Sequence, residues 1–181
     1  MFVKLKHPFR TPKFKTLDSH MRYGEVVNGV FMGIEYFKVD VNQAEVENLL
    51  NIIPKSYQKD FCLTLMKVNT RVPPHTDSGI NVTLNYYVET GNCVTNFYRF
   101  KDTPQSYQIQ NQTDGHIYSE DSVELSESFR AQSGEVYLLD VTKPHSVEPD
   151  LNFSMRTAFS LATNTYTFDE VSEMLKQTGN L

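Results

Sequence analysis

The sequence predicts a mainly β fold, a double-stranded β-helix (jelly roll) with a few helices packed outside it. Short runs with the alternation of strands follow one another along the chain, separated by turn-forming clusters. Twelve Phe and ten Tyr residues add side chains that favour strands. A length of 181 residues suits one hydrophobic core and is short for two, so we expect residues 1–181 to form a single domain.

Eight runs are predicted as strands, in chain order: Gly29–Val39, Phe61–Val68, Ile80–Glu89, Cys93–Phe100, Val123–Ala131, Glu135–Asp140, His145–Glu148 and Met155–Ala162. Clusters rich in Pro, Gly and Asn separate them and predict turns at residues 69–74, 90–92, 133–134 and 149–152. Residues 101–122 form the most irregular and polar stretch. Because so long a connection is usually functional or poorly ordered, we expect it near the mouth of a site.

Two segments have the periodicity of helices. Residues 42–53 place apolar side chains on one face, and Pro54 predicts the end of that helix. Residues 169–177 repeat the pattern, and either Thr167 or Asp169 can cap the start. These two helices complete the predicted jelly roll.

Charge is distributed unevenly. Five of the 17 basic residues lie in the first fifteen positions, which hold no acid, so the rest of the chain has 12 basic against 22 acidic residues, a net charge of −10. An acidic body argues against a broad nucleic-acid-binding face. The basic N-terminal segment is either an arm for an anionic partner or a solvated edge strand that its lysines protect from aggregation.

Hydropathy and cysteine content bear on the compartment. No apolar run approaches the roughly 20 residues that a membrane helix needs, and the N-terminus lacks the apolar stretch of a signal peptide. We therefore predict a cytoplasmic protein without a membrane partner. In that compartment, Cys62 and Cys93 are expected to be free thiols.

Three residues are candidate metal ligands. In an extended segment, His75 and Asp77 project to the same face and can reach one ion together. A second histidine, His145, opens the predicted strand after residues 135–140. Two imidazoles and one carboxylate on one face, with further coordination positions open, indicate a non-haem Fe(II) oxygenase.

A buried cation is predicted beyond the second histidine. Arg156 lies eleven positions after His145 on the returning strand, where it shares a face with Ala158 and Ser160. The two small neighbours leave room for a bound molecule. Because a guanidinium inside a barrel is costly without an anion and its planar fork suits a carboxylate, we expect a carboxylate-bearing ligand beside the metal.

These motifs occur in the order found in one superfamily. Residues 61–163 resemble the 2-oxoglutarate/Fe(II)-dependent oxygenases, particularly the prolyl-hydroxylase-like members. His75-Thr76-Asp77 resembles the metal-binding motif, Gly91–Phe97 the Gly-Gly-x-Thr-x-Phe turn, and His145–Pro149 the His-x-Val-x-Pro run. The chain departs from the pattern at Asn92, which replaces the second glycine, and near Met66, where many relatives carry a tyrosine that helps hold the cosubstrate.

The resemblance implies a reaction and its cofactors. Fe(II) would be held by His75, Asp77 and His145, 2-oxoglutarate would chelate the metal and pair with Arg156, and O2 would take the last position. The cosubstrate would be converted to succinate and CO2 while a C–H bond of the substrate is hydroxylated. The presence of Asp77 argues against the halogenase variant, in which that ligand is absent.

Further polar positions are expected to face the site. If the strand after Gly79 keeps the parity of the metal ligands, Asn81, Thr83, Asn85 and Tyr87 project inward. We expect Thr83 and Asn85, together with Ser160, to hydrogen-bond to the cosubstrate or to the substrate. Asp140 is expected to orient either the turn before His145 or a ligand imidazole.

Two alternatives of other classes remain open. One is a cupin-like jelly roll that binds metal without redox chemistry, and the other is an oxygenase fold that has lost catalysis and acts as an interaction module. The substrate, whether an amino acid, a peptidyl side chain, a small metabolite or a nucleobase, and the oligomeric state are not determined by the sequence.

Overall fold

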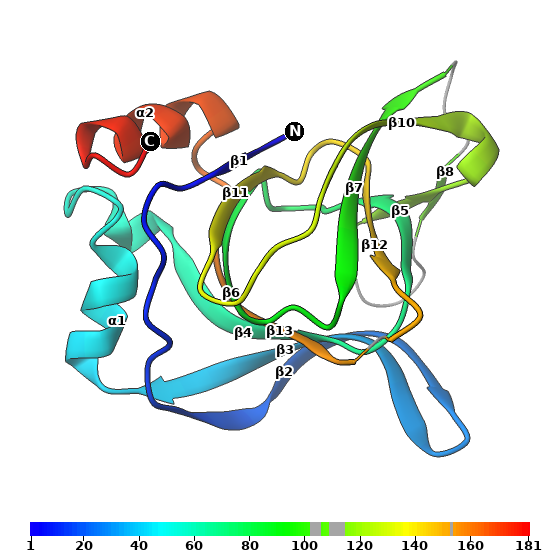
Figure 1. The fold of residues 1–181 in the computed structure, drawn as a ribbon, viewed down its shortest axis with the longest axis horizontal. Coiled ribbons are helices and arrows are strands. Elements are labelled where there is room, and N and C mark those ends of the chain that lie inside the picture. Colours follow the sequence, from blue (N-terminus) through cyan, green and yellow to red (C-terminus); the bar gives the residue numbers. More distant parts are fainter. Residues whose placement is uncertain (102–105, 109–114, 153) are drawn as a thin grey trace.

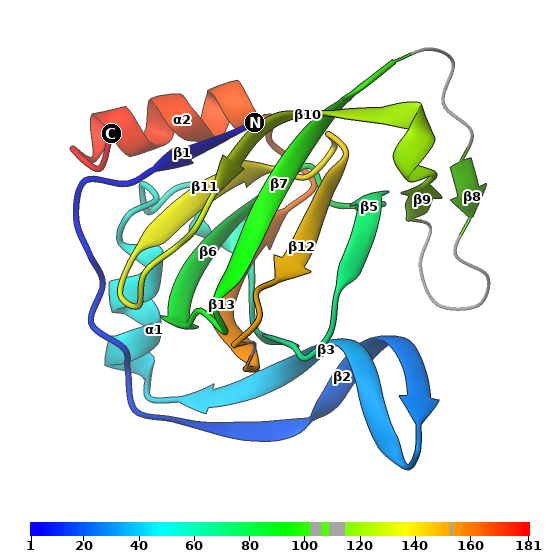
Figure 2. The same cartoon turned by 45° about the vertical axis from the view of Figure 1, so that its right-hand side comes forward.

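The computed structural model describes residues 1–101, 106–108, 115–152 and 154–181, which form two antiparallel β-sheets (Figures 1 and 2). The larger sheet has seven strands in the order β1 (Phe2–Lys4), β11 (Val136–Asp140), β6 (Val82–Glu89), β13 (Arg156–Thr163), β4 (Cys62–Val68), β3 (Val30–Val41) and β2 (Phe14–Val27). The smaller has six, in the order β10 (Val123–Phe129), β7 (Cys93–Phe100), β12 (His145–Pro149), β5 (Val72–Thr76), β9 (His116–Tyr118) and β8 (Ser106–Gln108). The predicted jelly roll is confirmed.

Strand β6 shows how the sequence builds both sides of the larger sheet. Val82, Leu84 and Tyr86 point outward into a buried cluster that includes residues of the two helices. Thr83, Asn85 and Tyr87 point the other way, toward the space between the sheets. The apolar face is therefore covered by helices, and the polar face is free to line a site.

Helix α1 (Gln43–Leu50) begins as predicted but ends earlier than the expected boundary at Ile53. The Asn42 side chain caps its start by accepting from the Glu45 backbone N–H at 3.0 Å. The carbonyls of Leu50 and Ile53 instead accept hydrogen bonds from the Gln58 amide, at 3.0 and 2.8 Å. Because these carbonyls find partners outside a helix, the chain can turn before the proline that was predicted to stop it.

Helix α2 (Phe168–Gln177) begins in a capping box. The Thr167 backbone N–H donates to Glu170 at 2.8 Å, and the Thr167 hydroxyl caps the Glu170 N–H, so Thr167 rather than Asp169 is the cap. Val171, Met174 and Leu175 are buried against the outer face of the larger sheet.

The β2–β3 hairpin corrects the sequence analysis, which predicted no strand at residues 14–27. Its two strands pair from Phe14↔Val41 to Val27↔Val30, and the ribbon projects past the body of the molecule (Figures 1 and 2). Asn28 and Gly29 form the two-residue turn with φ of 50° and 80°. An Asn-Gly pair between two valines is a strong signal for such a hairpin, so the strand was detectable.

Strand β5 is a second correction, because residues 69–74 were predicted as a turn. Two prolines, Pro73 and Pro74, lie inside the strand although they have no N–H to donate. The strand pairs with β12 at Val72↔Val147 and His75↔His145, with an irregularity between these pairs. Prolines are tolerated where a ladder is interrupted in this way.

Residues 101–122 were predicted to lie near the mouth of a site, and their strand β9 lies beside β5. Strand β9 pairs with β5 at His75↔Ile117, and both Gly115 and Ile117 line the cavity between the sheets. The prediction for residues 102–105 and 109–114 lies outside the described residues.

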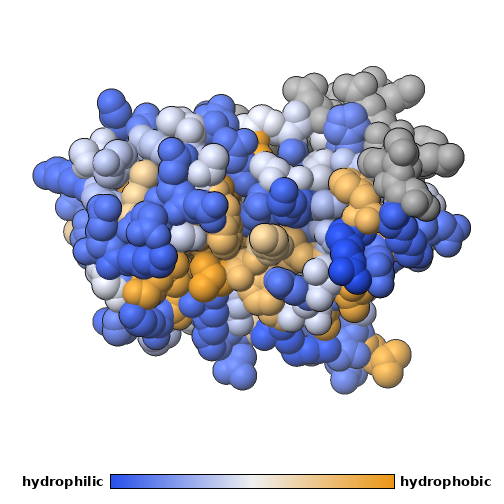
Figure 3. Space-filling model, turned by 90° about the horizontal axis from the view of Figure 1, so that it is seen from above, coloured by the Kyte–Doolittle hydropathy of each residue, from blue (hydrophilic) through white to orange (hydrophobic). Residues whose placement is uncertain are grey.

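Of the N-terminal basic segment, residues 2–4 and 14–15 lie in β1 and β2, the two outermost strands of the larger sheet. Strand β1 lies at one edge, where Lys4 pairs with Glu135, so the edge-strand interpretation holds for residues 2–4. Hydrophilic side chains cover most of the face that carries α2 and β10 (Figure 3). Cys62 and Cys93 are free thiols, as predicted. In the described part of the chain, neither helix is long and apolar enough to cross a membrane.

Candidate metal centre

Three predicted ligands meet where β5 and β12 run side by side. The ligand atoms of His75, Asp77 and His145 all lie within 4.8 Å of one another. The two histidines are directly paired in the ladder, and their ring centroids are 4.2 Å apart. Asp77 follows the end of β5, where its backbone N–H donates to the Val141 carbonyl at 3.1 Å. The chain therefore brings the three donors together from two separate segments.

Backbone carbonyls orient both imidazoles. Nδ1 of His75 lies 2.8 Å from the Pro73 carbonyl, and Nδ1 of His145 lies 3.0 Å from the Lys143 carbonyl. Since a carbonyl only accepts, each Nδ1 carries the proton and each Nε2 keeps a free lone pair. The ring of His145 also stacks on Phe97 at 5.6 Å. Both rings are thus held in the tautomer that a metal needs.

Electrostatics at the three residues favours a bound cation. Burial, with the proximity of His75, lowers the pKa of His145 well below its usual value, so that its imidazole is neutral. Burial raises the pKa of Asp77, although His75 opposes this. A buried carboxylate is costly without a nearby positive charge, and neutral imidazoles are the form that coordinates metal.

Arg156 is almost completely buried, with 1% of its surface exposed. Its guanidinium donates to the carbonyl of Cys93 at 2.9 Å, the hydroxyl of Thr95 at 2.8 Å and the carbonyl of Thr90 at 3.4 Å. These three neutral acceptors leave some of its five N–H donors available. Among the described residues, no carboxylate forms an ion pair with it.

The turn that supplies two of these acceptors depends on unusual backbone conformations. Gly91 has φ of +61°, and a Cβ there would lie 2.3 Å from the Ser154 carbonyl oxygen and 2.8 Å from the Arg156 nitrogen. Asn92, which replaces the second glycine of the resembled motif, has φ of +54°. Asparagine is the non-glycine residue that best tolerates this region, so the departure preserves the turn.

Strand register places Arg156 near the metal ligands but not against them. Thr95, which accepts from the guanidinium, pairs with Val147, while Phe97 pairs with His145. Two residues along a strand span roughly 7 Å. A ligand of a few carbons can therefore contact the triad and the guanidinium at once.

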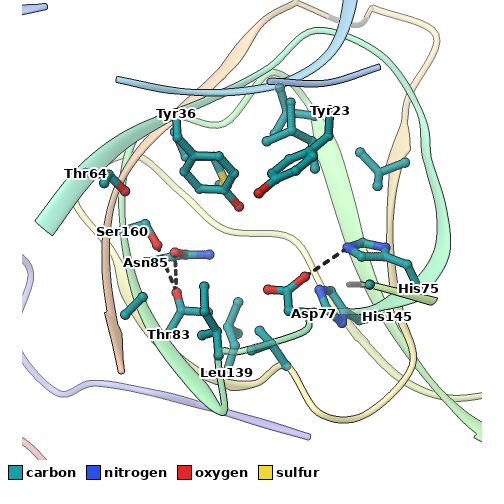
Figure 4. Close-up of a pocket in the computed structure, with 18 of the residues that line it drawn as sticks. Tyr23, Tyr36, Thr64, His75, Asp77, Thr83, Asn85, Leu139, His145 and Ser160 are labelled. Carbon is teal, nitrogen blue, oxygen red and sulfur yellow. Dashed lines mark hydrogen bonds and ion pairs between the residues drawn. The ribbon is translucent and has the colours of Figure 1, made fainter. Parts of the chain in front are cut away.

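Three further predicted residues form one buried cluster on the larger sheet. The Thr83 hydroxyl lies 2.7 Å from Asn85 Oδ1 and 3.2 Å from the Ser160 hydroxyl, and all three line the cavity. Ser160 is four residues from Arg156 on β13, roughly 13 Å along the strand. The cluster thus lies away from the guanidinium, on the wall across from the triad (Figure 4).

Two of the remaining expectations have clear structural outcomes. Asn81 does not line the cavity, because its amide donates to the Asn164 carbonyl at 3.0 Å, before the strand begins. Asp140 accepts from the Thr142 hydroxyl at 2.5 Å and from its N–H at 3.3 Å. It therefore orients the turn rather than a ligand imidazole.

The sequence analysis did not identify two tyrosines of the β2–β3 hairpin. Tyr23 and Tyr36 reach into the cavity with their hydroxyl groups directed inward (Figure 4). Tyr36 on β3 pairs with Met66 on β4, and both residues line the cavity. Tyr23 lies on the β2 strand that the sequence analysis missed, whereas Tyr36 lies on a predicted strand whose cavity-facing side was not assigned.

The space that these residues enclose has a volume of about 930 Å³. Pockets that bury small molecules have volumes of roughly 300–1,000 Å³. The triad, Arg156 and the polar cluster all line this one cavity.

Comparisons with known proteins give structural similarities only. No family model matches the chain, and no curated protein matches it. Among solved structures, it is similar to vicilin from Corylus avellana (hazelnut), with 14% identity and a TM-score of 0.40 over 88% of this chain. It is also similar to the non-haem α-ketoglutarate-dependent epimerase SnoN from nogalamycin biosynthesis, with 12% identity and a TM-score of 0.43 over 80% of this chain. The chain spans 31% of the vicilin chain and 66% of the epimerase chain.

Proposed function

We propose that this chain is an Fe(II)- and 2-oxoglutarate-dependent dioxygenase that hydroxylates a substrate C–H bond. The observation that carries the proposal is the pairing of two features within one cavity. A His-Asp-His group, in which Nδ1 of each histidine faces a backbone carbonyl, lies about two residues along a strand (roughly 7 Å) from a buried guanidinium that has no carboxylate partner among the described residues.

The residues of the triad fit a divalent metal. His75 and His145 would each coordinate through Nε2, because a backbone carbonyl holds the proton on Nδ1. Asp77 would supply the carboxylate, and the metal would supply the positive charge that its burial requires. When bound, Fe(II) with O2 and 2-oxoglutarate supplies the oxidising chemistry.

The deep end of the cavity fits the far carboxylate of the cosubstrate. Arg156 has donors left for an anion after its three neutral contacts. The ring of Tyr87 lies 5.3 Å from the Arg156 guanidinium carbon. The Tyr87 hydroxyl is buried and has no hydrogen-bond partner in the described part of the chain. An anionic oxygen at this end would satisfy groups that are otherwise costly to bury.

The protein's part in the reaction is placement and exclusion of water. Arg156 would bind and orient the dicarboxylic acid through its planar guanidinium. Thr83, Asn85 and Ser160 would hydrogen-bond to the metal-side end of the cosubstrate or to the substrate. The sheets on both sides keep bulk water from the reacting atoms.

Anaerobic titration tests the proposal directly. Fe(II) and 2-oxoglutarate together should give a weak visible charge-transfer band, and exposure to O2 with a substrate that accepts the second oxygen atom should release succinate. His145→Ala should remove the band, because one metal ligand is lost, whereas the exposed histidine variant His7→Ala should retain it. Metal binding without the band would instead favour a metal-binding jelly roll without redox chemistry.

A further inference from the structure

The cavity holds more room than the cosubstrate needs. Its volume of about 930 Å³ is near the upper end of the range for pockets that bury drug-sized molecules. A five-carbon dicarboxylic acid between Arg156 and the triad would fill only part of it. The rest lies between the polar cluster of Thr83, Asn85 and Ser160 and the two tyrosines of the β2–β3 hairpin (Figure 4).

Charged groups are absent from that second space among the described lining residues. The charged side chains that line the whole cavity are Lys59, Asp60, Arg71, Asp77 and Arg156. Asp77 and Arg156 belong to the proposed metal and cosubstrate sites. Of the other three, Arg71 and Asp60 have polar partners of their own, and Lys59 is exposed to solvent.

Lys59, Asp60 and Arg71 interact with other side chains or with solvent. Arg71 pairs with Glu148 at 2.7 Å and also with Glu120. Asp60 accepts from the Tyr166 hydroxyl at 2.6 Å, and Lys59 is exposed to solvent. With the metal on Asp77 and the cosubstrate on Arg156, a charged ligand in the second space would therefore lack a buried counter-charge, which is strongly unfavourable.

Two phenol groups provide the hydrogen-bond donors of this space. The Tyr36 hydroxyl has no hydrogen-bond partner among the described residues, and the Tyr23 hydroxyl donates only to the Met21 thioether, a weak acceptor. Burial, with the negative charge of Asp77, raises the pKa of both tyrosines, so both are protonated at neutral pH. Burial is the larger cause and persists when a metal offsets the charge of Asp77.

The remaining wall is apolar and adaptable. It includes the side chains of Met21, Met32, Ile34 and Met66. Methionine is flexible and polarisable, and it packs well against ring systems of irregular outline. The space thus combines neutral hydrogen-bonding groups with a soft apolar surface.

We propose that this second space binds an uncharged, oxygen-bearing small molecule as the substrate. A carbonyl, ether or hydroxyl oxygen accepts hydrogen bonds from Tyr23 and Tyr36, and the carbon skeleton lies against the methionine wall. Thr83, Asn85 and Ser160 form the opposite, polar side. The identification of the ligand as a substrate rests on the proposed oxygenase function, but its chemical class rests on the cavity alone.

Ring probes of matched size test the chemical class. Cyclohexanone and δ-valerolactam are uncharged acceptors, and cyclohexylammonium and cyclohexanecarboxylate are their charged counterparts. Binding is measured by ligand-observed NMR on the protein loaded anaerobically with Fe(II) and 2-oxoglutarate, and again on the metal-free protein. The uncharged probes should bind at least tenfold more tightly than the charged ones.

Phenylalanine variants test the two donors. Tyr23→Phe and Tyr36→Phe should each weaken cyclohexanone binding by roughly 2- to 12-fold, the loss expected for one hydrogen bond. Neither should change the affinity for 2-oxoglutarate measured from the charge-transfer band. Tyr57→Phe is the matched control, because Tyr57 is exposed and outside the cavity, and it should bind like the unmodified protein.

The outcomes separate this inference from the proposed function. Preference for charged probes, or displacement of cyclohexanone by an unstructured peptide, would overturn the small-molecule assignment. A weakened 2-oxoglutarate affinity in Tyr36→Phe would place that hydroxyl in the cosubstrate site and would also overturn it. Absence of the charge-transfer band, with probe binding intact in the metal-free protein, would refute the oxygenase and leave the binding site standing.

Discussion

In the proposed function, Arg156 is the side chain that binds the far carboxylate of the cosubstrate. It is a permanent cation in a site that holds it with two carbonyls and one hydroxyl. Such neutral contacts fix the orientation of the guanidinium without cancelling its charge. The residue is therefore prepared for an anion of defined position, which is the requirement for binding one end of a short dicarboxylic acid.

Replacing this side chain should separate cosubstrate binding from metal binding. Arg156→Ala should retain iron and lose about 30- to 1000-fold in affinity for 2-oxoglutarate, the equivalent of about 2–4 kcal/mol for a closed charge pair. Arg156→Lys should be intermediate, because it keeps the charge without the planar fork. Titration monitored by the charge-transfer band gives both affinities.

A matched arginine provides the control for that measurement. Arg99 is exposed and pairs with Glu124 across β7 and β10, so Arg99→Ala should bind 2-oxoglutarate normally. Unchanged affinity in Arg156→Ala would show that the cosubstrate carboxylate binds elsewhere.

At the residue scale, the sequence predicted which three candidate ligands would lie together. His75, Asp77 and His145 were expected to converge, and they do so because strand parity and the β5–β12 pairing agree. Tyr23 and Tyr36 were not foreseen. Tyrosine is common in strands as a packing residue, and nothing local to either position distinguishes a cavity-facing phenol from a buried ring.

Among the elements, the turn between β6 and β7 has a strict backbone requirement. Gly91 lies against the backbone of residues 154–156, so the turn can present the carbonyls of Thr90 and Cys93 to Arg156. A side chain at this position would separate the two segments. The orientation of the guanidinium is therefore a property of the turn as well as of the arginine.

Comparison of two glycines tests this requirement. Gly29→Ala should lower the free energy of unfolding by about 1–2 kcal/mol, because φ is positive but no atom lies within 4 Å of the added Cβ. Gly91→Ala should cost at least about 3 kcal/mol, since the Cβ also meets backbone at 2.3 Å. Urea unfolding measures both, and equal losses would contradict the close approach.

The contact between β1 and β11 should make stability depend on pH. Burial of the Glu135 carboxylate tends to raise its pKa, but Lys4, the Gln132 N–H and the Tyr137 hydroxyl together lower it below its usual value. A carboxylate with a lowered folded-state pKa stabilises the fold above its unfolded-state pKa, and this stabilisation is lost as the pH falls through the folded-state value.

Substitution of that carboxylate reveals its share of the pH dependence. Glu135→Gln should be less stable than the unmodified protein at pH 7, and the difference should shrink as the pH falls through the acidic range. Thermal unfolding across that range makes the comparison. Asp121, which is exposed and forms no ion pair among the described residues, provides the control in Asp121→Asn. A difference that is constant with pH would exclude a role for the ionised Glu135.

Element-level prediction was most accurate where apolar and polar residues alternate without interruption. The strands at 93–100 and 136–140 are close to the predicted runs, and α2 differs by one residue at its start. Prediction failed at β5, where two prolines indicate a turn but lie at an interruption of the ladder. Tertiary pairing decided that segment, and no local pattern records it.

At the scale of the whole molecule, metal and cosubstrate should stabilise the fold together. The triad residues lie on β5, on β12 and in the segment after β5, whereas Arg156 lies on β13. Metal and cosubstrate bound together would therefore link the two sheets. At concentrations one hundred times its dissociation constant, a ligand of the folded state adds about 2.7 kcal/mol. We expect the melting temperature to rise by roughly 5–10 °C.

Calorimetry under anaerobic conditions measures that linkage. Fe(II) with 2-oxoglutarate should raise the melting temperature, and excess chelator should reverse the rise. His145→Ala should show neither effect. An equal rise in this variant would mean that metal binds at another part of the protein.

The carbonyls that hold the two imidazoles also affect how this site tolerates sequence change. Pro73 and Lys143 contribute to the orientation of His75 and His145 through backbone oxygen, which every amino acid possesses. A side-chain acceptor in the same place could be removed by a single substitution. Here the backbone carbonyls of residues 73 and 143 hold the tautomer, so a side-chain substitution at either position keeps the acceptor. An evolving lineage could therefore alter the surroundings of the metal, and with them its substrates, without losing the geometry of the ligands.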